Sequence, residues 1–110
     1  MDVKLNGINE LRLALSGREN LDAVKTVVRK NGADMQRTAM RMVPVRTGTL
    51  KRSIELSIED GGLTARVRAT AEYASYVEWG TRFMNAQPFI RPAFAQQAGK
   101  FKNDMNKLVR

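Results

Sequence analysis

The chain has 110 residues, of which 19 are Lys or Arg and 11 are Asp or Glu, so its net charge is +8, and it contains neither cysteine nor histidine. These absences exclude disulfides and thiolate metal sites and remove the commonest general base at neutral pH, so we expect no metal or other cofactor. The length fits a single domain, residues 1–110, and no apolar run approaches the ~20 residues that span a bilayer, so we expect no membrane contact.

The excess of positive charge predicts an anionic partner, either nucleic acid or an acidic protein surface. The alternative is a basic protein that its charge keeps soluble. The N-terminus, MDVKLNGINEL, lacks the apolar core of a signal peptide, so we expect the protein to act in the compartment where it is made.

The first predicted element is a short opening helix within residues 3–15. Its sequence, INELRLAL, follows Asn6 and Gly7, and Ser16-Gly17 is expected to end it.

Residues 20–43 fit a longer helix, which Asn20 caps and Pro44 ends. Apolar residues recur in it at three-, four- and seven-residue intervals, which predicts one buried stripe: Leu21, Val24, Val28, Met35, Ala39 and Met42. Asn31-Gly32 interrupts this helix and is expected to loosen or bend it.

A basic stripe lies on the other side of the same helix and consists of Lys25, Arg29, Lys30, Arg37 and Arg41. The simplest interpretation is a solvated face. The alternative is a face that meets DNA or an acidic surface.

Two alternating segments, 53–59 and 63–70, predict a β-hairpin in which each strand has one buried and one solvated face. The Asp-Gly-Gly sequence between them is typical of a tight turn. Glu55 faces Arg68 if the two glycines form the loop, and it faces Arg66 if Asp-Gly forms the loop. Both registers set acid against base on the solvated face, so the choice between them stays open.

Residues 91–109 again fit a helix, with Pro92 in its first turn. Its apolar stripe consists of Phe94, Ala98, Phe101, Met105 and Leu108. Together with the helix at 20–43 it can cover the apolar face of the hairpin. We therefore predict the α+β class: a small antiparallel sheet, made of the central hairpin and one or two further strands, packed against a long helix in the N-terminal half and a C-terminal helix.

The segment 73–94, YASYVEWGTRFMNAQPFIRPAF, concentrates aromatic residues but offers little chemistry. Its only acid, Glu78, is the one carboxylate to consider in a toxin-like or regulatory enzyme. No histidine, SxxK pattern, P-loop or GxGxxG accompanies it, so we do not expect an enzyme. Aromatic residues of small domains are mostly core, and we expect Tyr73 and Val77 there, whereas Trp79 is either the last core residue or the first contact residue.

A small basic nucleic-acid-binding module is the alternative function. Basic residues beside aromatic ones bind single strands by stacking and by neutralising phosphates. Against this, the sequence has no RRM, KH or helix-turn-helix pattern.

Three short motifs follow one another: VPVRTGTLKRSI at 43–54, YASYVEWGT at 73–81 and AQPFIRPAF at 86–94. In the first, we expect Gly48 to adopt a turn conformation that other residues resist. A polar loop between the second and third carries two large apolar side chains, Phe83 and Met84. These are either folded back onto the core or meant for a partner.

Together, the three motifs resemble the small tail-component proteins of long-tailed bacteriophages, which act in tail completion and head–tail joining, over about residues 5–109. The resemblance implies a structural virion protein of a phage or prophage, assembled in the cytoplasm of the bacterial host, that is monomeric in solution and forms a homo-oligomeric ring around the DNA channel. It implies as partners the head connector or head-closure protein and the tail terminator or tail tube, with DNA contact in the channel. Arg46 departs from the family pattern, in which an acidic residue is common before the Thr-Gly pair.

From this resemblance we expect an assembly interface at the Thr-Gly-Thr turn and around the loop 81–87. Its candidate residues are Arg46, Thr47, Gly48, Thr49, Trp79, Thr81, Arg82, Phe83, Met84 and Asn85. The basic stripe is the candidate surface for DNA or an acidic neighbour, and no catalytic, cofactor-binding or metal-binding residue is expected.

Overall fold

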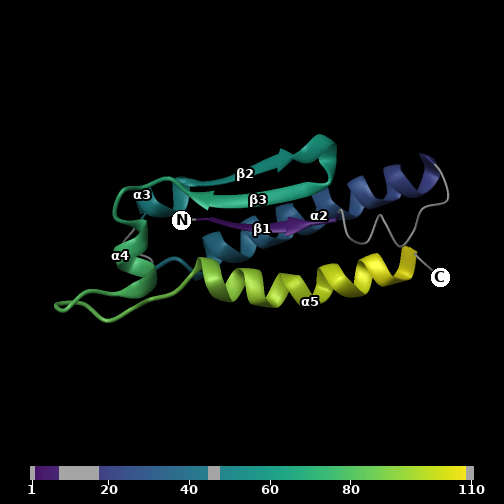
Figure 1. Ribbon diagram of the computed structural model, residues 1–110. Helices are drawn as coiled ribbons and strands as arrows, with labels where there is room; N and C mark the ends of the chain where they lie inside the picture. Colours follow the sequence, from purple (N-terminus) through teal and green to yellow (C-terminus); the bar gives the residue numbers. More distant parts are fainter. Residues whose placement is uncertain (1, 8–17, 45–47, 109–110) are drawn as a thin grey trace.

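The computed structural model describes residues 2–7, 18–44 and 48–108, and it has two layers, a sheet and a pair of helices (Figure 1). The elements in chain order are β1 (Asp2–Asn6), α2 (Arg18–Met42), α3 (Gly48–Arg52), β2 (Ile54–Glu59), the 3-10 turn η1 (Asp60–Gly62), β3 (Thr64–Ala69), α4 (Ala74–Trp79) and α5 (Ile90–Leu108). The long helices α2 and α5 lie side by side against one face of the sheet. The predicted α+β class is confirmed.

The sheet has three antiparallel strands in the order β1-β3-β2, so the predicted hairpin gains one further strand. Glu55 pairs with Arg68 in the ladder, which selects the register with the two glycines at the tip. Asp60, Gly61 and Gly62 all have positive φ there, at 54°, 67° and 101°, a conformation that favours glycine.

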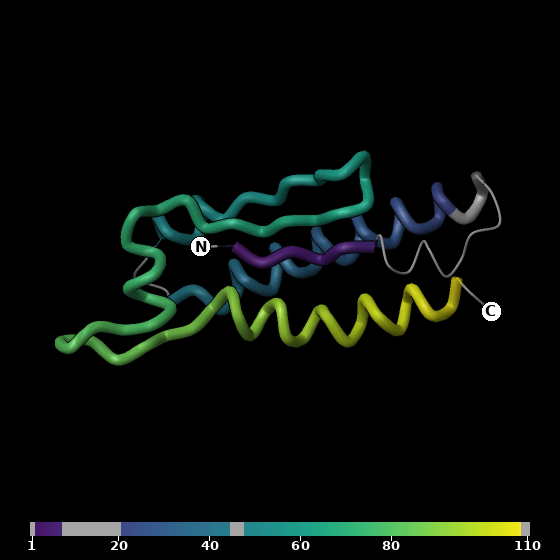
Figure 2. The backbone as a smooth tube through the Cα atoms, viewed as in Figure 1, coloured from purple at the N-terminus to yellow at the C-terminus, as the bar shows by residue number. Residues whose placement is uncertain are grey.

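The opening segment corrects the prediction of a helix at 3–15, because Asp2–Asn6 is a strand. Val3 and Leu5 alternate with polar residues and pair with Val67 and Ala65 of β3. Pairing with β3 satisfies the backbone of this segment, whereas a helix as short as the predicted one is marginal by itself. The rest of the predicted helix, 8–15, lies outside the described residues. Figure 2 shows that this first strand and the last helix of the chain lie alongside one another.

Helix α2 ends at Met42, as the position of Pro44 predicts, but it begins at Arg18. Asn20 is therefore inside the helix and is not its cap. Of the predicted stripe, Val24, Val28, Met35 and Ala39 are buried in the core, while Leu21 and Met42 are half-buried.

Helix α2 continues without a break through Asn31-Gly32. Gly32 is buried where the helix meets the sheet, and a Cβ atom at this position would lie 2.6 Å from the Cβ of Ala65. Asn31 is buried as well, and its amide donates to a carboxylate oxygen of Asp104 at 3.1 Å and accepts from Gln97. The pair therefore joins α2 to β3 on one side and to α5 on the other.

Helix α5 matches the predicted C-terminal helix, with Pro92 in its first turn. Its buried face consists of Ile90, Ala93, Gln97, Phe101 and Met105, flanked by the half-buried Phe94, Ala98 and Leu108. No helix in the described part of the chain is long and apolar enough to cross a membrane.

Candidate functional site

A short helix, α4, stands between the sheet and the most exposed part of the chain. A helix of six residues can turn only one side to the core, and here that side carries Ala74, Val77 and Glu78. Val77 is in the core as expected, but Tyr73 is 37% exposed, so its prediction as a core residue is wrong. Trp79 is 61% exposed, which makes it a surface residue.

The carboxylate of Glu78 is fully buried and binds the start of α5. One of its oxygens accepts the backbone N–H groups of Phe89 and Ile90 at 3.0 and 2.9 Å. The other accepts the backbone N–H and the Nε–H of Arg91 at 3.2 and 2.8 Å. Glu78 thus supplies, from another element, the acceptors that a helix N-terminus needs.

Burial alone would raise the pKa of Glu78. The hydrogen bonds from Ile90, Phe89 and Arg91 outweigh that effect and leave the pKa below its ordinary value of 4.5. A carboxyl group that acts as a general acid or base near neutral pH needs a raised pKa instead. The hydrogen-bonding capacity of this carboxylate is also already used, so its role is to hold α4 against α5.

Residues 81–87, here called the arm, project from the end of the molecule beyond α4 (Figure 1). The arm turns at its tip, where Thr81 and Met84 exchange backbone hydrogen bonds of 2.8 and 3.3 Å. At its base, the N–H of Gln87 donates to the carbonyl of Val77 at 2.8 Å. Gly80, which directly precedes the arm, has φ 79° and ψ 176°, a conformation open almost only to glycine.

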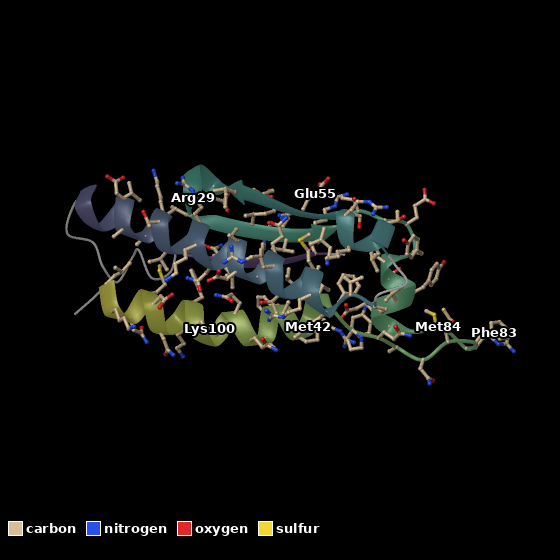
Figure 3. The ribbon with its side chains drawn as sticks, turned by 180° about the vertical axis from the view of Figure 1, so that it is seen from behind. Arg29, Met42, Glu55, Phe83, Met84 and Lys100 are labelled. Atoms are coloured by element: carbon tan, nitrogen blue, oxygen red, sulfur yellow. The ribbon has the colours of Figure 1, made fainter. Side chains whose placement is uncertain are left out.

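The two large apolar side chains of the arm do not fold back onto the core. Figure 3 shows Phe83 at the tip with Met84 behind it, and these side chains are 89% and 38% exposed. The guanidinium of Arg82 lies 5.2 Å from the centre of the Phe83 ring. Of the two alternatives left open by the sequence, the arrangement fits contact with a partner.

An open cleft of about 420 Å³ lies at the base of the arm, where β1, α4 and α5 meet. Its lining consists of Asp2, Val3, Ser75, Glu78, Trp79, Ile90 and Arg91. The Arg91 guanidinium stacks 3.6 Å from the centre of the Trp79 ring. Because Arg91 is also paired with Glu78, this cation is held in place from two sides.

The Thr-Gly-Thr motif lies only partly within the described residues, which exclude Arg46 and Thr47. Gly48 opens the short helix α3 and does not have positive φ, so the expected turn conformation is wrong. Thr49 is exposed and accepts a 3.5 Å hydrogen bond from Arg52, while Leu50 anchors α3 in the core. Figure 1 shows α3, α4 and the arm at the same end of the molecule, so the fold brings the described residues of the candidate interface together.

The basic stripe lies on the outward side of α2. Arg29, Lys30, Arg37 and Arg41 are exposed and Lys25 is half-buried. Arg37 pairs with Asp34 one turn earlier. Figure 3 shows Arg29 toward the end of the molecule opposite Phe83, so this part of the stripe lies away from the arm.

Comparison with known proteins places most of the chain in one family. The model of a family described as "Bacteriophage HK97-gp10, putative tail-component" matches residues 11–80, which include the first motif and all of the second except its last residue, Thr81. The arm and α5 follow the matched part. Searches of curated proteins and of solved structures gave no match. Because the family match spans more than half of the sequence, the chain belongs to the HK97-gp10-like family of bacteriophage tail components.

Proposed function

We propose that the protein is a structural component of the virion that completes the tail or joins it to the head connector, and that the arm makes the contact. The observation that supports this proposal most directly is Phe83, an aromatic side chain 89% exposed at the tip of a projecting, internally bonded turn. Exposed aromatic residues of this kind are enriched in protein–protein contacts. Membership of the tail-component family supplies the setting.

The proposal assigns the protein a structural task in place of catalysis. Its partners would be the head connector or head-closure protein on one side and the tail terminator or tail tube on the other. It would be monomeric in solution, form a homo-oligomeric ring in the virion and be assembled in the host cytoplasm, with DNA passing through the ring.

The proposal can be tested in the phage by replacing both apolar residues of the arm, Phe83→Ser with Met84→Ser. Neither side chain is in the core, so the variant should fold normally by circular dichroism and thermal melting. We expect electron microscopy to show full heads and finished tails that stay unjoined.

Ile58→Ser is a matched control, because Ile58 on β2 is as exposed as Met84, at 38%, and lies in the sheet away from the arm. This control should give infectious particles. Normal infectious particles from the arm variant would overturn the assignment of the arm to head–tail joining.

A nucleic-acid-binding module is the second candidate function. It is supported by the basic stripe, since Arg37 is the only one of its five cations with an ion pair among the residues that the structure describes. Unpaired cations on one helix face are available to phosphates.

A further inference from the structure

We infer that the arm of one copy of this chain docks in the cleft of a second copy. The inference rests on the proposed function, because it names the partner of the arm in that assembly. It joins two observations, the exposed apolar side chains at the tip of the arm and a partly apolar cleft that this tip does not occupy.

The arm offers a compact, cationic and apolar tip. Phe83 and Met84 supply the apolar surface, and Arg82 lies against the Phe83 ring. The arm has no acidic residue. Its hydrogen bonds at both ends, together with the Glu78 clamp on α5, hold it in one shape, which lowers the entropy cost of docking.

The cleft offers the complementary surface. Its accessible apolar part consists of the half-buried Val3 and the Trp79 ring, which is 61% exposed, whereas Ile90 in its wall is buried. The Phe83 ring of an incoming arm would pair with the Trp79 ring, and aromatic pairs add to the energy of area burial. The volume of the cleft, about 420 Å³, falls in the range of ~300–1,000 Å³ typical of binding pockets.

The charges also match. Glu78 and Arg91 neutralise one another at the cleft, which leaves Asp2 at the rim. Asp2 pairs with Arg66, yet its side chain stays 42% exposed, so it can also accept from the Arg82 of an incoming arm. Ion pairs at such a rim set orientation more than affinity.

The geometry makes the contact intermolecular. Phe83 is 89% exposed, so it does not occupy the cleft of its own chain. Arm and cleft are different surfaces, so a single contact leaves one free arm and one free cleft, unless two chains dock reciprocally about a two-fold axis. Repetition of such a contact closes into a ring or continues as a filament.

The absence of cysteine allows a direct test by cross-linking. Asn85→Cys places a thiol on the arm and keeps Phe83, and Ser75→Cys places one at the exposed rim of the cleft. The two purified variants are mixed at high concentration and treated with a short bis-maleimide, which traps a contact too weak to give a stable dimer in solution. We expect a covalent heterodimer at about ten times the yield obtained when Lys102→Cys, exposed on α5, replaces the cleft variant.

A second arm variant that carries both Asn85→Cys and Phe83→Ser separates docking from random collision. The heterodimer yield with Ser75→Cys should fall to the level of the Lys102→Cys control, because the apolar anchor is missing. Equal yields with and without Phe83, or efficient cross-linking of Asn85→Cys to itself, would overturn the inference. Self-linking would indicate a symmetric contact between two arms.

Failure of this inference can be distinguished from failure of the proposed function. If no specific heterodimer forms but the arm variant in the phage still leaves heads and tails unjoined, the arm contacts another virion protein and only the inference fails. If the heterodimer forms and the same phage variant assembles normally, the copies associate as inferred and the proposed role in joining fails.

Discussion

At the scale of single residues, Glu78 is a buried anion that binds Phe89 and the first two residues of α5, Ile90 and Arg91. Glu78→Gln keeps the size of the side chain but removes its charge. It also places an NH2 group, itself a hydrogen-bond donor, against the N–H donors of residues 89–91. We expect the free energy of unfolding at about pH 7 to fall by about 2 kcal/mol, the range for hydrogen bonds to charged groups. Urea denaturation measures this change, and Glu72→Gln, at an exposed position two residues before α4, is the control that should leave it unaltered.

The same carboxylate predicts a dependence of stability on pH. The pKa of Glu78 is lowered by folding, so its contribution is fully present above the ordinary value of 4.5 and is lost as the pH falls through the lower pKa of the folded state. The stability difference between wild type and Glu78→Gln should therefore shrink between about pH 5 and about pH 3. A difference that stays constant over this range would show that the charge of Glu78 is not what stabilises the fold.

At the scale of elements, we predict opposite effects on stability when two helical glycines are replaced by alanine. Gly32→Ala improves helix propensity by about 1 kcal/mol but forces a Cβ to within 2.6 Å of Ala65, so we expect a net loss of about 1–3 kcal/mol. Gly99→Ala, in α5, meets no atom within 4 Å and should stabilise the protein by about 0.5–1 kcal/mol. Thermal melting of both variants measures the contrast, and equal effects would contradict the close packing of α2 on β3.

Elements that depend on neighbours in sequence were predictable. The hairpin follows from alternation and from an Asp-Gly-Gly turn, and the end of α2 follows from Pro44, because both are decided by local sterics. The strand β1 was not predictable in this way. Its few alternating residues form a strand only because β3, far along the chain, offers an unpaired edge.

The candidate site was also predictable only in part. Features that depend on neighbours in sequence could be predicted, and features that depend on distant segments could not. The loop at 81–87 follows from its polar sequence, which left open whether Phe83 and Met84 fold back onto the core or face a partner. The cleft was not predictable, because it draws its lining from β1, α4 and α5. The exposure of Tyr73 depends on which side of α4 meets the core. The capping role of Glu78 likewise depends on residues 89–91, which follow the arm. Their distance from Glu78 in the sequence matches no helix or strand repeat that would reveal the contact.

At the scale of the whole molecule, the charges are divided unequally between the two layers. The strands balance three basic residues, Lys4, Arg66 and Arg68, against three acidic ones, Asp2, Glu55 and Glu59. The described side chains of the long helices are mainly basic: Lys25, Arg29, Lys30, Arg37, Arg41, Arg91, Lys100, Lys102 and Lys107 against Asp22, Asp34 and Asp104. The helical layer is therefore the side of the molecule that attracts an anionic partner.

This division predicts which surface would meet DNA if the protein is a nucleic-acid-binding module. Arg29→Gln with Lys30→Gln removes two exposed cations from the helical layer, and Lys4→Gln with Arg68→Gln removes two exposed cations from the sheet, so both variants lose the same net charge. If DNA meets the helices, the slope of log K against log salt should decrease by about 2 in the first variant and stay near the wild-type value in the second. Titrations with duplex DNA from about 50 to about 200 mM salt measure it. Equal slopes in the two variants would mean that net charge alone draws the protein to DNA, and that result would remove the support for the nucleic-acid-binding alternative.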